Sequence, residues 1–214
     1  MDMIEIESIT LSYNQQTVLQ EFSLSIENGA KVAICGTSGC GKSSILRCLL
    51  GFARPERGKI IVNGTELDGQ TVWQIRKLIG YVAQEPQLGE GQVREIIERP
   101  LHYKANREIA YNINKLGGLF AEFDLKESVL SKNIASLSGG EKQRVALITA
   151  LLLERQILLL DEISSALDPK SRGKVLEHIF QTDKTVVFVS HDPVVISSCD
   201  RVVTLDGDGQ GGRQ

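Results

Sequence analysis

The stretch KVAICGTSGCGKSSILRCLLG, residues 31–51, places an apolar run, a glycine-rich loop and a helical pattern directly after one another. KVAIC (31–35) is apolar after its lysine and contains β-branched residues, which predicts a buried strand. GTSGCGKS (36–43) matches the spacing G-x-x-x-x-G-K-[ST], and KSSILRCLLG predicts a helix that ends at Gly51. In a loop between a strand and a helix, backbone N–H groups and the helix N-terminus together attract phosphate. The sequence therefore predicts a nucleotide-binding site.

The residues of this loop have separate predicted roles. Lys42 is expected to reach the β- and γ-phosphates of the nucleotide, and the Ser43 hydroxyl is expected to ligate Mg²⁺. The alternative is a tight strand-to-helix turn that binds nothing. Cys40 is interpreted as a small space-filling residue, with redox sensing as a second hypothesis because it lies beside the predicted phosphates. The predicted phosphate-binding residues are Gly36, Thr37, Ser38, Gly39, Cys40, Gly41, Lys42, Ser43 and Ser44.

The segment ILLLDE (157–162) places two carboxyl groups at the end of an apolar strand. Doubly wound sheets open onto their ligands at the carboxyl ends of the strands, so the pair is expected beside the phosphate loop. Asp161 is suited to hold Mg²⁺, directly or through water. Glu162 points in a different direction and is predicted to polarise the attacking water as a general base. The alternative is a strand that simply becomes polar where it reaches solvent.

The composition is that of an ordinary globular chain, with 214 residues of which 42% are hydrophobic and 24% charged. This length suits one large domain or one domain with an inserted lobe. The net charge is −3, so no nucleic-acid partner is expected. The four cysteines show neither metal-ligand spacing nor disulfide density, which favours reduced cytosolic thiols. The longest apolar run, VALITALLL (145–153), is too short for a membrane span and the start MDMIEIES is unlike a signal peptide, so we expect a soluble chain.

Strand and helix patterns alternate along most of the chain. IEIESITLSY and FSLSI alternate with period two and predict half-buried strands near a sheet edge, and KIIVNG and IGYVAQ predict strands around the amphipathic TVWQIRKL. Residues 85–136 carry no strand pattern and predict short helices broken by Pro100 and by Gly117 and Gly118. A helix, the strand ILLL, a helix near 171–181, the strands TVVFVS and RVVTL and a frayed tail DGDGQGGRQ follow. The pattern predicts an α/β sheet with a helical insertion.

LSGGEKQ (137–143) places two consecutive glycines and an acid at the head of a long helical pattern. With the phosphate loop and ILLLDE, and followed by SALD (165–168) and SHD (190–192), this order of motifs resembles the ABC-type ATPases over nearly the whole chain. The resemblance implies the α/β fold of P-loop NTPases (RecA-like), with a mainly parallel sheet core, an N-terminal antiparallel β subdomain and an inserted α-helical subdomain. It implies a single ABC ATPase domain over residues 1–214. Its expected parts are a nucleotide-binding core, 1–84 and 137–214, and a helical subdomain, 85–136.

The resemblance also implies a head-to-tail homodimer, in which each LSGGE segment (137–141) faces the ATP bound to the other copy. Ser138 is then expected to donate its hydroxyl to the γ-phosphate, and Gly139 and Gly140 to let backbone amides approach that phosphate closely. Glu141 belongs to the same expected contact group, and Asp168 is expected at the dimer seam. The implied cofactors are ATP and Mg²⁺.

Three more positions match functional residues of the family. Tyr13 is expected to stack on adenine, with a plain strand-surface tyrosine as the alternative. Gln84, which ends YVAQ, is expected to contact Mg²⁺ and the attacking water, and His191 is expected to contact the γ-phosphate. The resulting catalytic group is Glu162, His191, Gln84 and Lys42, and the expected metal ligands are Ser43, Gln84 and Asp161. The residues interpreted as structural or as packing residues are His102, His178 and Trp73.

Within the family, the chain resembles the separate ATP-binding subunit of a membrane transporter. We expect a transmembrane permease subunit as its partner and a cytoplasmic location at the inner face of the cell membrane. QEPQLGEGQVREII (84–97) is similar to the exporter pattern Q-x-P-x-L-F-x-G-x-V-x-x-x-I, with Gly89 in place of the phenylalanine. SKNIASLSGGEKQR and LLLDEISSALD resemble bacterial ATP-binding subunits assigned to iron efflux.

Two other function classes stay open at this stage. The first is a soluble ABC-type ATPase that acts as a switch on DNA, the ribosome or cluster assembly, against which the overall acidity and the absence of insertions count. The second is a small-molecule kinase that uses the phosphate loop, which gives the LSGGE segment no role.

Overall fold

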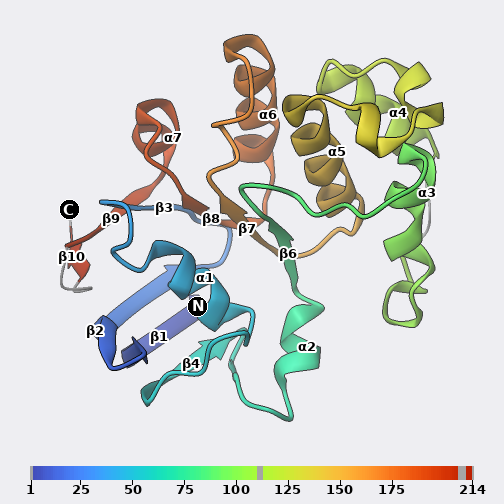
Figure 1. Ribbon diagram of the computed structural model, residues 1–214. Coiled ribbons are helices and arrows are strands. Elements are labelled where there is room, and N and C mark those ends of the chain that lie inside the picture. The colour runs from blue at the N-terminus through green and yellow to red at the C-terminus, as the bar shows by residue number, and fades with distance from the viewer. Residues whose placement is uncertain (1, 110–112, 207–210, 214) are drawn as a thin grey trace.

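A six-stranded sheet runs through the middle of the molecule and separates two layers of covering elements (Figure 1). The computed structural model describes residues 2–109 and 113–206, and the backbone of 211–213. The strand order is β10-β9-β3-β8-β7-β6, and every neighbouring pair is parallel except β9 and β10. The strands are β3 (Lys31–Gly36), β6 (Ile79–Val82), β7 (Ile157–Asp161), β8 (Thr185–Val189), β9 (Arg201–Leu205) and β10 (Gly211–Arg213).

Strand β7 is buried on both faces, which explains why its sequence is an unbroken apolar run. Leu158 and Leu160 enter one hydrophobic core and Ile157 and Leu159 enter a second core on the opposite face of the sheet. Successive side chains of a strand point to opposite faces, so a strand covered on both sides is apolar at every position. The first core joins the sheet to the helices on one face, and the second joins it to helix α1 (Lys42–Leu49) and the smaller sheet on the other (Figure 1).

The smaller sheet is antiparallel, in the order β2-β1-β4-β5. Its strands are β1 (Asp2–Tyr13), β2 (Gln16–Glu27), β4 (Arg57–Val62) and β5 (Thr65–Glu66). This confirms the expected antiparallel unit, although β1 lies between β2 and β4 and is not an edge strand. Asn14 and Gln15 join β1 to β2 with φ of 49° and 67°, the left-handed conformations of a two-residue hairpin turn.

Five helices cover the main sheet or connect its strands. The predicted helix near 171–181 begins two residues earlier because the Asp168 carboxylate accepts hydrogen bonds from the N–H groups of Lys170 and Ser171, and Pro169 occupies the first turn. No helix within the described residues combines the length and apolarity needed to cross a bilayer. The helices are α1 (Lys42–Leu49), α2 (Val72–Arg76), α5 (Gly139–Leu152), α6 (Pro169–Gln181) and α7 (Pro193–Ser198).

Residues 85–136 form short helices, as expected, but two predicted details are wrong. Helix α4 (Ile113–Glu122) runs straight through Gly117 and Gly118, because the buried face formed by Leu116, Leu119 and Phe120 outweighs the low helix propensity of glycine. The pattern NREIAYNINKL does not form one helix, since residues 104–106 form a 3₁₀ turn and α4 starts at 113; residues 110–112 lie outside the described part. The other helices are α3 (Val93–Glu98) and the 3₁₀ segments Arg99–His102, Glu127–Ser131 and Ile134–Ser136.

Other local predictions have mixed outcomes. Helix α3 ends at Glu98, just before Pro100, which confirms the predicted break there. The interpretation of Trp73 as a packing residue is wrong: it is 69% exposed, and the Arg76 guanidinium lies 4.8 Å from its ring centroid. The prediction of a frayed tail is wrong for Gly211–Arg213, which pair with β9. Residues 207–210 and 214 lie outside the described part. His178 accepts or donates a 2.7 Å hydrogen bond with Glu122, consistent with a structural role.

Candidate nucleotide-binding site

A cleft of about 660 Å³ opens at the carboxyl ends of β3, β7 and β8. Because these strands are parallel neighbours, the loops that follow them meet at one edge of the sheet. Twelve of the predicted site residues line this cleft, from five separate stretches of sequence. They are Tyr13, Gly36, Ser38, Gly39, Gly41, Lys42, Ser43, Ser44, Gln84, Asp161, Glu162 and His191.

The glycine-rich loop has the backbone conformation that an anion-binding loop needs. Gly39 and Gly41 have φ of 84° and 104°, which side chains with a Cβ disfavour, and helix α1 begins directly at Lys42 without a side-chain cap. The N–H groups of Lys42 and Ser43 are therefore available to phosphate, whereas the Ser44 N–H donates to the Gly41 carbonyl (2.9 Å). The Lys42 ammonium lies across the concave side of the loop, where it donates 2.9 Å hydrogen bonds to the carbonyl oxygens of Gly36 and Thr37.

Cys40 and Thr37 do not line the cleft. Cys40 is buried, and its Sγ lies 2.8 Å from where a Cβ on Gly36 would be placed. The geometry supports the interpretation of Cys40 as a space-filling residue under the loop. All four cysteines are free.

Ser43 and Asp161 bring the expected oxygen ligands together. The Ser43 hydroxyl lies 3.5 Å from Asp161 Oδ1, at the position where α1 starts beside the end of β7. Burial raises the pKa of Asp161, and the neighbouring Glu162 charge adds to this increase. Hydroxyl and carboxylate oxygens are the donors that Mg²⁺ prefers, and a carboxylate held in an unfavourable buried place gains most from a cation. The residues present therefore fit Mg²⁺ bound together with phosphate oxygens.

Glu162 holds an unusual backbone conformation directly after β7. Its φ is +49°, and its N–H donates a 2.8 Å hydrogen bond to the carbonyl of Val189 at the end of β8. Strained residues of this kind concentrate at functional sites. Glu162 Oε2 is buried and makes no hydrogen bond, although His191 Nδ1 lies 2.8 Å away. Glu162 also lines the cleft, so its carboxylate lies where a group that orients water is needed.

Tyr13 and Gln84 both line the cleft and are both exposed. Tyr13 ends β1 at the hairpin turn and is 40% exposed, so its ring is open to a base. Gln84 follows β6 by two residues and is exposed. Sequence reasoning missed three lining residues, Val18, Arg47 and Val189. Arg47 lies one helical turn after Ser43, so helix periodicity offered a signal for it, whereas nothing in the sequence singles out Val18.

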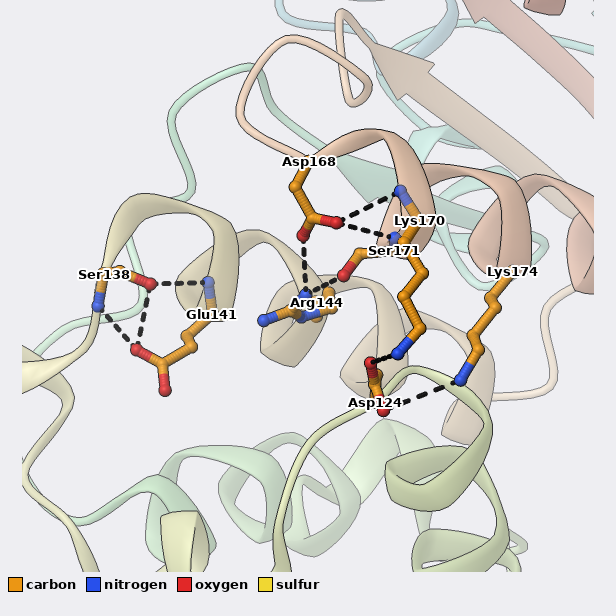
Figure 2. A network of polar contacts seen from close by, with 8 residues as sticks. All are labelled: Asp124, Ser138, Glu141, Arg144, Asp168, Lys170, Ser171 and Lys174. Carbon is orange, nitrogen blue, oxygen red and sulfur yellow. Dashed lines mark hydrogen bonds and ion pairs between the residues drawn. The ribbon is translucent and has the colours of Figure 1, made fainter.

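The LSGGE segment does not belong to the cleft of its own chain. Ser138 caps α5 and forms a capping box with Glu141: Glu141 Oε2 accepts hydrogen bonds from the Ser138 N–H (2.8 Å) and hydroxyl (2.9 Å) (Figure 2). The backbone N–H of Ser138 lowers the pKa of Glu141. The structure therefore gives Glu141 a capping role that its sequence spacing could have revealed.

The two glycines of this segment have different surroundings. A Cβ on Gly140 would lie 2.8 Å from the carbonyl oxygen of Ala166, so the backbone of SALD leaves room only for glycine. A Cβ on Gly139 would meet nothing within 4 Å. Gly140 is thus explained by packing inside the chain, whereas Gly139 borders open space.

Asp168 lies beside α5, not in the cleft. Its Oδ1 accepts the α6 N–H bonds and its Oδ2 lies 3.6 Å from Arg144 NH1, while Arg144 also donates to the Ser171 hydroxyl (Figure 2). Lys170 and Lys174 reach from α6 to Asp124 in the helical segment, at 3.1 and 3.6 Å (Figure 2). Asp168 and the start of α5 are thereby held as one unit.

Comparisons with known proteins agree with this geometry. The family model described as ABC transporter matches residues 19–165. The energy-coupling factor transporter ATP-binding protein EcfA1 of Oenococcus oeni is 34% identical over 98% of this chain and 78% of its own length. The lactococcin-A transport/processing ATP-binding protein LcnC of Lactococcus lactis subsp. lactis is 34% identical over 88% of this chain, which spans only 27% of that protein.

Solved structures show the same fold. A dimeric ATP-binding cassette in a post-hydrolysis state, bound to ADP and Pi, is 30% identical with a TM-score of 0.84 and covers 99% of this chain and 97% of its own. A bacterial Atm1-family ABC exporter with ATP bound has a TM-score of 0.85 at 25% identity, over 98% of this chain and 38% of its own. The expected P-loop NTPase fold is thereby confirmed. The chain belongs to the ABC transporter family, as an ATP-hydrolysing ATP-binding cassette.

Proposed function

We propose that two copies of this chain bind two MgATP molecules between them, head to tail, and that their hydrolysis powers transport through a separate membrane permease. The observation that carries this proposal is the separation of the LSGGE segment from the cleft in one chain. Ser138 and Gly139 present a capped helix N-terminus next to open space. A helix N-terminus with an uncovered glycine is suited to a phosphate that another copy supplies.

Each side chain of the cleft has a task in this mechanism. Lys42 and the N–H groups of the glycine loop hold the β- and γ-phosphates, and Tyr13 stacks on adenine. Ser43 and Asp161, with Gln84, would hold Mg²⁺, which when bound neutralises phosphate charge. Glu162 takes a proton from the attacking water, and His191, whose Nδ1 lies 2.8 Å from Glu162 Oε2, contacts the γ-phosphate. These residue roles are proposals that rest on the contacts described above.

The contribution of the partner copy is the LSGGE group. The Ser138 hydroxyl, released from Glu141, donates to the γ-phosphate, and the backbone beside Gly139 and Gly140 approaches it. Asp168 lies at the seam between the copies. Glu141 then acts mainly by fixing Ser138 and less by direct phosphate contact, since its carboxylate would repel that phosphate.

The test uses Glu162→Gln, which keeps the shape of the side chain but removes the base. With MgATP this variant should form a stable dimer in size-exclusion chromatography and release no phosphate. Glu162→Gln combined with Ser138→Ala should bind ATP equally well but dimerise more weakly. Phosphate release by Glu162→Gln at the wild-type rate would remove Glu162 from the role of base. A monomer at saturating ATP, with the permease present, would contradict the sandwich.

An exposed aromatic cluster lies away from the cleft. Phe52 and Trp73 are 67% and 69% exposed, and the Arg76 guanidinium lies 4.5 and 4.8 Å from their ring centroids. Exposed aromatic clusters with an arginine are typical of protein interfaces. We propose that this cluster and the helical subdomain, 85–136, receive the permease, while the core is formed by 1–84 and 137–214. The chain would then act at the inner face of the cell membrane.

The direction of transport and the transported cargo are two further proposals. The match to LcnC and to an Atm1-family exporter supports export, and the iron-sulfur clusters transporter ATM1 of Candida glabrata is 33% identical over 95% of this chain and 29% of its own length. The match to EcfA1 is equally good, so metal or iron export rests on the resemblance alone. The soluble switch is the second candidate. Membrane recovery of the chain only when the permease is co-expressed would distinguish transport from that switch.

A further inference from the structure

Gln143 is a buried polar residue that the proposed chemistry leaves without a task. Its side chain is 0% exposed, inside α5 and one helical turn after Gly139. Nε2 donates a 3.3 Å hydrogen bond to the carbonyl oxygen of Ala83, whereas the buried Oε1 accepts none. A buried amide oxygen without a partner destabilises a fold, and methionine would fill the same space without it. Stability alone therefore does not explain a glutamine here.

The acceptor of this hydrogen bond, the Ala83 carbonyl, lies next to a residue of the nucleotide cleft. Ala83 lies between Val82, the last residue of β6, and Gln84, which lines the nucleotide cleft. Gln143 thus joins the backbone beside the cleft of its own chain to the helix that begins with the LSGGE segment. The helix also packs directly on this strand, since a Cβ on Gly80 would lie 3.7 Å from the carbonyl oxygen of Ala150. Because α5 packs closely on this strand, a shift of the Ala83 peptide can act on the helix.

We propose that Gln143 is a positioning residue that makes the orientation of the LSGGE segment depend on Gln84 of the same chain. The inference rests on the proposed ATP sandwich, in which Gln84 contacts one ATP and the LSGGE segment contacts the other. When Gln84 moves onto bound nucleotide, the Ala83 carbonyl moves with it and carries Gln143. The free Oε1 gives the shifted backbone a second contact, so the first turn of α5 follows. Each copy thereby reports the state of its own site to the site across the dimer.

The experiment compares Gln143→Met, which keeps the volume but removes both amide groups, with Thr149→Val as a matched control. Thr149 lies in the same helix and donates a 2.8 Å hydrogen bond to the Val145 carbonyl, remote from Ala83. For each variant we would measure the affinity for ATP with EDTA present, the melting temperature, and kcat, KM and the Hill coefficient for ATP. Gln143→Met should bind ATP within twofold of wild type and melt within a few degrees of it. Its kcat should fall at least tenfold, and its Hill coefficient should fall to 1.

The control variant should keep the wild-type kcat and a Hill coefficient above 1. Gln143→Glu serves as a second variant, because at pH 8 its carboxylate repels the Ala83 carbonyl, and it should lose at least as much kcat. Wild-type kcat and cooperativity in either variant would overturn the inference, as would loss of ATP binding together with a low melting temperature in both. The outcome is separable from the proposed function: failure of Glu162→Gln to dimerise, with Gln143 intact, would contradict the sandwich itself.

Discussion

His191 Nδ1 lies 2.8 Å from Glu162 Oε2, although the two residues follow different strands. The histidine side chain is 77% exposed and the glutamate side chain only 12%, so an exposed imidazole meets a buried carboxylate at the mouth of the cleft. β7 and β8 are parallel neighbours, which is why the residues just beyond their ends meet. The imidazole therefore covers Glu162 Oε2 from the exposed side of the cleft.

Replacing this histidine should impair chemistry while sparing nucleotide binding. His191→Ala frees Glu162 and removes a donor near the γ-phosphate, so kcat should fall by about 10²-fold or more. ATP affinity should stay within a few-fold, because the glycine loop is untouched. Steady-state phosphate release and equilibrium binding of a fluorescent ATP analogue measure the two effects. An unchanged kcat would show that the 2.8 Å contact has no catalytic role.

The two LSGGE glycines should respond in opposite ways to alanine. Gly140→Ala places a Cβ 2.8 Å from the Ala166 carbonyl and should lower the free energy of unfolding by about 1–3 kcal/mol. Gly139→Ala meets open space and should leave it unchanged or raise it by up to about 1 kcal/mol, since alanine favours helix. Only Gly139→Ala should lose ATP-driven dimerisation while fully folded. Urea unfolding and size-exclusion chromatography test the pair, and equal destabilisation by both would contradict the argument.

Asp161→Asn should stabilise the chain without nucleotide and inactivate it. Burial raises the pKa of Asp161, so the stability it contributes is present below about pH 4 and is lost as pH rises through its folded pKa. The asparagine variant lacks this loss and should be more stable at pH 7, by up to about 1 kcal/mol, and equal to wild type near pH 3.5. Urea unfolding at both pH values measures this difference. MgATP should protect wild type but not the variant, and a variant less stable at pH 7 would refute the prediction.

The exposed aromatic cluster should matter only when the permease is present. Phe52→Ala and Trp73→Ala remove side chains that are 67% and 69% exposed, so the free energy of unfolding should change by less than about 0.5 kcal/mol. Basal ATPase activity should stay at the wild-type level, whereas co-purification with the permease should drop. Val194→Ala, in α7 outside the proposed docking surface and at a site that is 50% exposed, serves as the control. Equal co-purification of all three variants would place the docking surface elsewhere.

Much of the fold and of the cleft could be predicted from short segments of sequence. The strands around KVAIC and ILLL, the glycine loop and the Asp161–Glu162 pair depend on local patterns of apolar residues, glycine and charge, which determine local structure directly. Local patterns failed where burial decided the outcome. Gly117 and Gly118 stay helical because of the apolar face beside them. The exposure of Trp73 was not predictable, because the five-residue helix α2 carries too short a pattern to indicate which side meets the core.

The sequence by itself determined that a strand, a phosphate loop and a helix follow one another, because each depends on residues adjacent in the chain. Only the tertiary structure decided that the Ala166 carbonyl leaves no room for a side chain at Gly140 and that Gln143 donates a hydrogen bond to the Ala83 carbonyl. It also decided that Gly139 borders open space. These contacts join residues 26 to 60 positions apart. Distances of this kind are fixed by the packing of α5 against β6 and the SALD backbone, which no local pattern encodes.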